Sequence, residues 1–238
     1  MFEVISPFAL IMRVEQLNED IWPRTWLVID ESSGEAALID PVMEFVQRDL
    51  ATLGNLKLKY AIATHTHADH ITGCFDLSNI TGAEYVMWEN TACVDVTRFV
   101  SEGDSLFVGE IELKFHHVPG HTNDSMLVEA GNFLFTGDFL FTGDGGVGRD
   151  DLPSGRLLDH WDSLRVLDQF SDDYLVCTGH DPPGLEMQTL GWARINNPVL
   201  KMASLEEYTD WQKEQWEVLG PVSKIRVALP SNLLAEGP

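Results

Sequence analysis

The most informative stretch of the sequence is the run His65-Thr66-His67-Ala68-Asp69-His70. The run places three histidines and one aspartate within six positions. Neutral imidazole and carboxylate groups are the ligands that Zn²⁺ and non-haem Fe²⁺ prefer in proteins. An isolated histidine is more often a structural residue, and we interpret His116, His117 and His160 in that way. The run therefore predicts a metal site.

Four apolar segments of the chain each stop at a residue that can bind a metal. Segments 60–64, 114–120, 133–137 and 174–179 end immediately before His65, His121, Asp138 and His180, respectively. Binding sites are commonly built on loops that a rigid scaffold positions. If the four segments are strands of adjoining sheets, their ends deliver these four side chains to one edge.

The sequence offers two candidates for the aspartate ligand. The tetrapeptide Phe-Thr-Gly-Asp occurs twice, ending at Asp138 and again at Asp144. Asp138 follows a predicted hairpin strand that opens at Gly131-Asn132, whereas Asp144 lies in a glycine-rich loop. We therefore predict that Asp138 is the ligand.

The chain alternates predicted strands and helices, which indicates an α/β fold. Three hairpins are expected, at residues 26–40 with a turn near Gly34, at 105–118 with a turn at Gly109-Glu110, and at 125–137 with a turn at Gly131-Asn132. A helix is expected over about residues 43–53, and a buried strand over 174–177. Apolar residues that recur at helical spacing between them are interpreted as core: Leu157, Trp161, Leu164 and Leu167. No repeat or linker interrupts the sequence, which predicts a single domain over residues 1–238.

Composition argues against several classes of function. Hydrophobic residues make up 44% of the chain, yet no apolar run approaches the roughly 20 residues needed to cross a bilayer. A net charge of −23 would repel nucleic-acid phosphates and anionic lipids, so neither is an expected partner. The acidic residues are scattered along the chain, and a high-salt habitat is one hypothesis for them.

Two further features bear on the cellular compartment. The N-terminal residues Met1–Pro7 show no basic segment that leads into an apolar core, so no secretory signal is expected and a cytoplasmic location is the default. The cysteines Cys74, Cys93 and Cys177 are odd in number and widely spaced. We expect them to be reduced and buried rather than joined in disulfides.

Taken together, the run at residues 65–70 and the later ligands resemble the metallo-β-lactamase superfamily. The resemblance spans most of the chain and implies an αββα sandwich, in which two β-sheets lie between layers of helices. It also implies a set of metal ligands. His65, His67 and His121 would bind a first metal, Asp69, His70 and His180 a second, and Asp138 would lie between them.

Within that superfamily the chain looks most like the persulfide dioxygenases (sulfur dioxygenases) and the related glyoxalase II group. Four stretches carry this resemblance: Thr64–Gly73, Gly148-Arg149-Asp150-Asp151, Gly179-His180-Asp181 with Asn197-Pro198, and Val227–Leu233. In the dioxygenases a single Fe²⁺ is held by residues that match His65, His121 and Asp138. Glyoxalase II enzymes usually carry a helical C-terminal region for glutathione, whereas this chain ends soon after a tail like that of the dioxygenases.

The resemblance therefore implies a metal-dependent enzyme with two main alternatives. A non-haem iron oxidoreductase would convert glutathione persulfide to sulfite and glutathione with one Fe²⁺ per chain. A hydrolase with Zn²⁺ or a dinuclear centre would use Asp69 to orient water towards a thioester or lactone. A metal-binding module without catalytic activity is the third possibility, and a homo-oligomer is possible in each case.

An anionic thiol-derived substrate would need a local basic contact on so acidic a protein. Arg149 is the first candidate for that role. A structural arginine that bridges loops to Asp150 or Asp151 is an equally weighted interpretation, because both uses exploit the same planar donor fork. Arg156 and Arg194 are weaker candidates.

Overall fold

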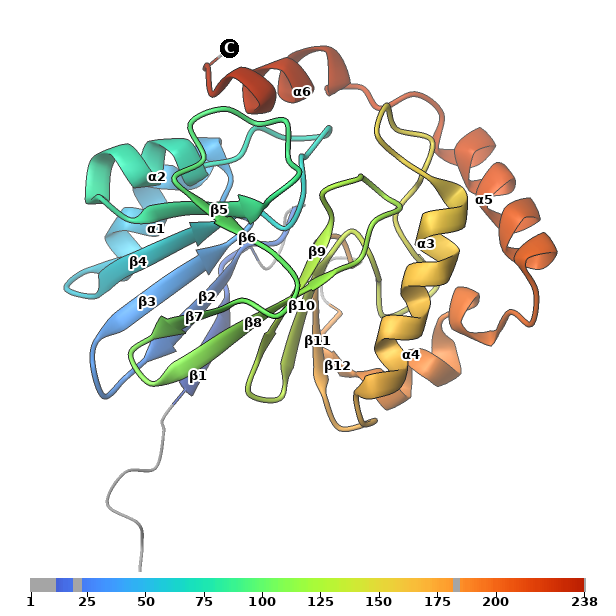
Figure 1. The fold of residues 1–238 in the computed structure, drawn as a ribbon, viewed down its shortest axis with the longest axis horizontal. Helices are drawn as coiled ribbons and strands as arrows, with labels where there is room; N and C mark the ends of the chain where they lie inside the picture. Colours follow the sequence, from blue (N-terminus) through green and yellow to red (C-terminus); the bar gives the residue numbers. More distant parts are fainter. Residues whose placement is uncertain (1–11, 19–22, 182–184, 238) are drawn as a thin grey trace, which may run out of the picture.

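The computed structural model describes residues 12–18, 23–181 and 185–237. Two six-stranded sheets face each other in it, and helices cover their outer faces (Figure 1). The N-terminal residues Met1–Pro7, from which the absence of a secretory signal is predicted, lie outside the described residues. None of the helices in the described ranges combines the length and apolar character that crossing a bilayer requires.

The first sheet has its strands in sequence order. An antiparallel part consists of β1 (Met12–Gln16), β2 (Trp26–Asp30) and β3 (Glu35–Ile39), and β4 (Lys57–Ile62), β5 (Glu84–Trp88) and β6 (Arg98–Val100) follow as parallel strands. The predicted hairpin between β2 and β3 is confirmed, with Gly34 at a φ of +70° in the turn. The predicted helix is present as η1 (Met43–Phe45) followed by α1 (Val46–Leu53), and α2 (Cys74–Thr81) links β4 to β5.

The second sheet holds the strands of the C-terminal half. Its order is β12-β11-β10-β9-β8-β7. The strands are β7 (Ser105–Val108), β8 (Ile111–His117), β9 (Met126–Ala130), β10 (Phe133–Gly137), β11 (Leu175–Thr178) and β12 (Gln188–Thr189). Both predicted hairpins are confirmed, because Gly109 and Gly131 adopt the left-handed conformation that tight turns require. The predicted strand at 174–177 is β11, which pairs in parallel with β10.

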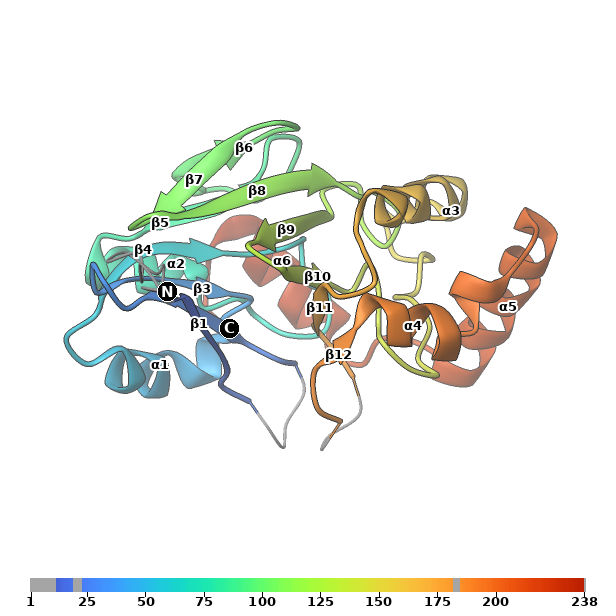
Figure 2. The same cartoon turned by 90° about the horizontal axis from the view of Figure 1, so that it is seen from below.

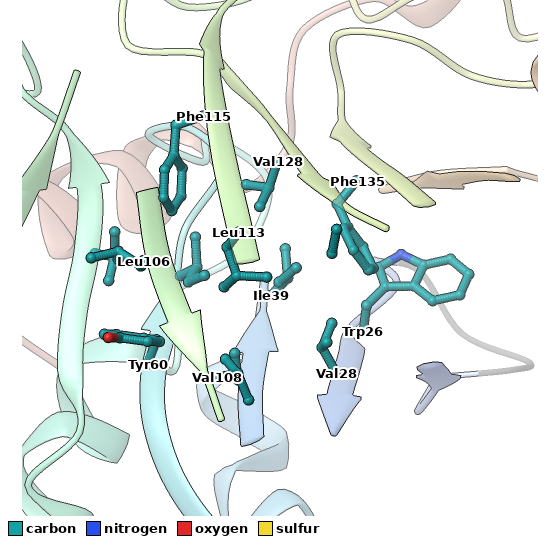
Figure 3. Packing of buried hydrophobic residues seen from close by; sticks show 14 of the residues in the cluster. Trp26, Val28, Ile39, Tyr60, Leu106, Val108, Leu113, Phe115, Val128 and Phe135 are labelled. Carbon is teal, nitrogen blue, oxygen red and sulfur yellow. The ribbon is translucent and has the colours of Figure 1, made fainter. Parts of the chain in front are cut away.

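The central core lies between the two sheets. Trp26, Val28 and Ile39 of the first sheet belong to one buried cluster with Phe115 and Phe135 of the second, and Figure 3 shows Phe135 beside Trp26. All five residues of β2 are buried, since helices cover the outer face of the sheet as well. The sequence of a strand that is covered on both faces is therefore a continuous apolar run rather than an alternation of apolar and polar residues.

Two outer layers complete the sandwich. Val46 of α1, Leu77 of α2 and Leu233 of α6 (Ile225–Leu234) pack against the first sheet. The second sheet is covered by α3 (Leu157–Ser163), α4 (Leu190–Asn196) and α5 (Leu205–Leu219), which lie on the opposite side of the molecule from α1 in Figures 1 and 2. The predicted αββα architecture is therefore confirmed.

The packing also tests the predicted apolar stripe and the predicted burial of the cysteines. The apolar stripe from Leu157 to Leu167 joins the core beneath α3, but the α-helix ends at Ser163 and continues as a 3₁₀ helix, η2 (Leu164–Gln169). The three cysteines are buried and free, as expected.

Candidate metal centre

The predicted ligands follow the ends of four strands that belong to both sheets. His65 comes three residues after β4 in the first sheet, and Asp138 and His180 come shortly after β10 and β11 in the second. His121 follows β8 through the turn at Pro119-Gly120. The site therefore spans one end of the sandwich and draws on both halves of the chain.

Two groups of possible ligand atoms converge there within the described residues. His65, His121 and Asp138 form the first group, and His67, Asp69 and His70 form the second, with the ligand atoms of each group within 4.8 Å of one another. The first group is the two-histidine, one-carboxylate set that the resemblance implies for a single iron. The geometry places His67 with Asp69 and His70, although its ring also lies 4.1 Å from that of His65.

His180 and Asp144 lie outside both groups. The Nδ1 atom of His180 is 2.6 Å from Oδ1 of Asp138, and its Nε2 atom is 3.1 Å from Oδ2 of Asp69. His180 thus joins the carboxylates of the two groups. Asp144, the competitor of Asp138 in the sequence, is exposed in the following loop.

The buried histidine nitrogens fit a metal ion. Nε2 of His65, Nδ1 of His67 and Nε2 of His70 are buried and have no hydrogen-bond partner in the part of the chain that the structure describes. The other nitrogen of each ring is 3.0 Å from Thr64 Oγ1, 3.1 Å from Asp40 Oδ1 and 3.2 Å from Asp69 Oδ1, respectively. Metal-binding histidines use one nitrogen for the ion and hold the ring through the other. The arrangement is therefore that of a metal-binding site.

Burial and neighbouring charges favour the metal-binding protonation states of the first ligand group, His65, His121 and Asp138. Burial, reinforced by the neighbouring His67 and His121, holds the pKa of His65 well below its usual value. Burial also lowers the pKa of His121. Burial alone would raise the pKa of Asp138, but the adjacent His180 and His121 outweigh it and lower that pKa. Neutral imidazoles and an ionised carboxylate are the forms that bind a metal. Against the effect of burial, Asp40 raises the pKa of His67 and Asp138 raises that of His180, so a metal ion would have to displace a proton from each of these two histidines.

Asp40, which our sequence analysis did not identify, positions the metal-binding run. It follows β3, is 3% exposed and has a φ of +51°. Its carboxylate accepts hydrogen bonds from the backbone N–H and the hydroxyl of Thr64, both at 2.7 Å, and lies beside His67. A buried strand that ends in Ile-Asp-Pro is the sequence signal that could have identified it.

Glycines allow the chain to pass close to the ligands. A Cβ atom at Gly148 would lie 2.3 Å from the carbonyl oxygen of Asp138 and 2.7 Å from Nδ1 of His121. A Cβ atom at Gly179 would lie 2.5 Å from Oδ1 of Asp138. Side chains at these two positions would therefore displace the ligands.

Asn232 of α6 ties the C-terminal helix to the metal-binding run. Its Nδ2 atom donates to the carbonyl oxygens of His67 and His70, both at 2.9 Å, and its Oδ1 atom accepts from the N–H of Thr72 at 2.9 Å. The side chain is buried. The tail that contributed to the family resemblance therefore has a physical role, which is to hold the backbone of the run.

Arg149 makes the contacts of a structural arginine. Its Nε and Nη2 atoms donate to the carboxylate of Asp151 at 2.6 and 2.7 Å, and Nη1 donates to the carbonyl oxygen of Gly220 at 2.7 Å. Its own carbonyl oxygen lies 2.6 Å from Nδ1 of His121 and so orients that ring. A contact between Arg149 and substrate stays a prediction.

The three histidines interpreted as structural have protein partners and belong to neither ligand group. Nε2 of His116 lies 3.0 Å from Glu129, and Nε2 of His160 lies 2.9 Å from the carbonyl oxygen of Phe139. The ring of His117 stacks on that of Trp88 with the centroids 4.6 Å apart.

Comparisons with known proteins show the family to which the chain belongs. The family model of the metallo-beta-lactamase superfamily matches residues 20–180. The mouse (Mus musculus) mitochondrial persulfide dioxygenase ETHE1 is 32% identical over 221 residues, which cover 88% of this chain and 82% of the mouse protein. A hydroxyacylglutathione hydrolase of Cereibacter sphaeroides is 32% identical over 190 residues, which cover 74% of this chain and 69% of that enzyme.

A solved structure extends the similarity to the three-dimensional level. The crystal structure of ETHE1 from Myxococcus xanthus matches with a TM-score of 0.85 and 34% sequence identity, covering 94% of this chain and 99% of the other. The family match covers more than half of the sequence and includes every candidate ligand from His65 to His180. The chain therefore belongs to the metallo-β-lactamase superfamily.

Proposed function

We propose that this protein is a persulfide dioxygenase that uses one Fe²⁺ to oxidise glutathione persulfide to sulfite and glutathione. The observation that carries the proposal is the convergence of His65, His121 and Asp138 in a chain this similar to ETHE1 of Myxococcus xanthus. Two histidines and one carboxylate that leave neighbouring positions open are typical of non-haem iron oxygenases.

The overall reaction consumes one dioxygen and one water for each persulfide. Both atoms of dioxygen are transferred to the terminal sulfur, water supplies the third oxygen of sulfite, and cleavage of the sulfur–sulfur bond releases glutathione. Bound Fe²⁺ would supply the reactivity towards dioxygen that side chains lack.

The chain's own residues hold and shield the centre. Thr64 and the carbonyl of Arg149 fix the rings of His65 and His121 through their Nδ1 atoms. The ligands His65, His121 and Asp138 are at most 8% exposed, so bulk water has little access to them. Fixed and shielded ligands keep the centre ordered before substrate binds.

A hydrolase is the second candidate, and the second group of ligands favours it. His67, Asp69 and His70 also converge, and a hydroxyacylglutathione hydrolase is among the relatives. The side chain of Asp69 is 37% exposed and lies next to His180, so it could orient an attacking water. This function requires a second metal, for which the resemblance implies Asp69, His70 and His180 as ligands.

Metal content and substrate turnover distinguish the two functions. Protein purified without oxygen and loaded with iron should bind one ion per chain, consume O₂ when given glutathione persulfide, and release sulfite in equal amount. It should hydrolyse glutathione thioesters poorly. Rapid thioester hydrolysis without persulfide-dependent O₂ uptake would reject the proposal and support the hydrolase.

Ligand variants sharpen the comparison. His65→Ala, His121→Ala and Asp138→Ala should each abolish activity, whereas His180→Ala should keep one metal per chain and part of the O₂ uptake. His116→Gln is a matched control, because His116 contacts Glu129 and belongs to neither ligand group. Loss of all metal in His180→Ala would contradict the mononuclear centre.

A further inference from the structure

A cavity of about 420 Å³ adjoins the metal centre at His70. Its walls come from four distant parts of the chain: Pro23 before β2, the segment after β3, the end of the metal-binding run, and the start of α6. Val42, Phe45, Ile71 and Val227 give it an apolar lining. A cavity of this volume that combines an apolar lining with a few polar groups is typical of small-molecule sites.

Lys224 is the only cation among the described residues that line this cavity. Its ammonium group is 3.9 Å from Oε1 of Glu44, which is beyond hydrogen-bond distance, and both side chains are more than half exposed. An ion pair of this kind is weak, so the ammonium group can exchange Glu44 for another carboxylate. Lys224 also immediately precedes α6, whose first turn contains no acidic residue. The partial positive charge of the helix N-terminus therefore adds to that of Lys224.

An anionic substrate needs a local cation on this protein, because the rest of the chain is strongly acidic. A net charge of −23 repels any anionic substrate, including the glutathione carrier of the proposed reaction. Arg149 is already bound to Asp151 and to the carbonyl of Gly220. Lys224 is both less engaged and part of a cavity that reaches a residue of the metal centre.

We propose that this cavity is the subsite for the carrier part of the thiol substrate, and that Lys224 binds one of its carboxylates. The inference rests on the proposed function and narrows the substrate class to persulfides whose carrier has a carboxylate. The apolar wall packs against the carrier, and the persulfide end points past His70 towards the metal centre. Glu44 acts as an internal competitor for Lys224.

Steady-state kinetics with matched substrates tests the subsite. Lys224→Met should raise the KM for glutathione persulfide about fivefold with little change in kcat, because a contact remote from sulfur binds ground and transition states alike. Its KM for the persulfide of glutathione diethyl ester should equal that of the wild type. Glu44→Gln should lower the KM for glutathione persulfide, since it removes the competitor.

The control variant is Lys114→Met. Lys114 is an exposed lysine of β8 with a similarly loose contact, 3.8 Å from Glu112, and it does not line the cavity. An unchanged KM in Lys224→Met, or the same change in Lys114→Met, would overturn the inference.

Calorimetric titration with glutathione separates this inference from the proposed function. Lys224→Met should weaken the binding of glutathione to the metal-loaded protein about fivefold, and Lys114→Met should not. A protein that oxidises no persulfide but binds glutathione through Lys224 would refute the dioxygenase and keep the subsite. Persulfide oxidation together with identical glutathione affinity in both variants would keep the dioxygenase and refute the subsite.

Discussion

Oδ1 of Asp40 lies 3.1 Å from Nε2 of His67, which leaves Nδ1 of His67 as the nitrogen that faces the metal centre. Asp40→Ala should raise the metal dissociation constant about 10- to 100-fold. A carboxylate bonded to the second nitrogen of a metal-binding histidine orients the ring and increases its basicity. Asp40→Asn should have a smaller effect, since asparagine tolerates the φ of +51° and can still bond to Thr64. Competition with a chelator measures both constants, and equal affinity in all three proteins would contradict the assignment.

Asn232 should stabilise the backbone of the metal-binding run, although it lies more than 160 residues away in sequence. Asn232→Ala removes three hydrogen bonds and leaves the buried carbonyl oxygens of His67 and His70 without that donor. We expect a loss of about 3 kcal/mol in the free energy of unfolding and weaker metal binding. Asn232→Asp keeps an acceptor for Thr72 but loses the donor, so metal binding should remain weak while α6 stays docked. Denaturant titrations and metal competition measure the two effects, and wild-type metal affinity in Asn232→Asp would rule out this role.

Gly148 and Gly143 lie in the same loop and make a matched pair. Gly148→Ala would press a methyl group against the carbonyl of Asp138 and the ring of His121, whereas the nearest atoms to a Cβ at Gly143 are 3.9 Å away. We expect Gly148→Ala to lose metal affinity and activity at least tenfold and Gly143→Ala to behave like the wild type. Metal content after dialysis provides the measurement. Equal metal retention in the two variants would show that the loop yields without disturbing the ligands.

His160 should make the folded state sensitive to acid. Burial lowers its pKa to about 4 from a usual value of 6.5. Between these two values the unfolded chain binds a proton that the folded protein does not, so stability is lost as the pH falls from about 6.5 to about 4, by about 3 kcal/mol in total. His160→Gln can keep the hydrogen bond to Phe139 but cannot titrate. The difference in unfolding free energy between wild type and variant should therefore shrink by that amount between pH 7 and pH 4, and a difference independent of pH would contradict the assignment.

Local sequence signals predicted the features that short-range chemistry determines. The turns at Gly34, Gly109 and Gly131 were predictable because glycine adopts their left-handed backbone at the lowest steric cost. The ligand run was predictable because its side chains are adjacent in sequence, and Asp138 could be preferred over Asp144 from the strand that precedes it.

Contacts between distant parts of the chain were not predictable in this way. Asp40 meets His67 only because β3 and β4 pair in parallel, and Asn232 reaches the run only through the docking of α6. The two interpretations of Arg149 were left open because the contact with Gly220, 71 residues away, has no local signal. The grouping of His67 with Asp69 and His70 likewise depends on ring orientations that Asp40 sets.

The placement of His65 in one half of the sandwich and of His121 and Asp138 in the other gives the metal a mechanical role. An ion held by these three side chains is a crosslink between the two sheets, because neither half has the full ligand set. The free energy of metal binding is then added to the free energy that holds the halves together. Removal of the metal would thus destabilise the interface between the two sheets, in addition to removing the reactive centre.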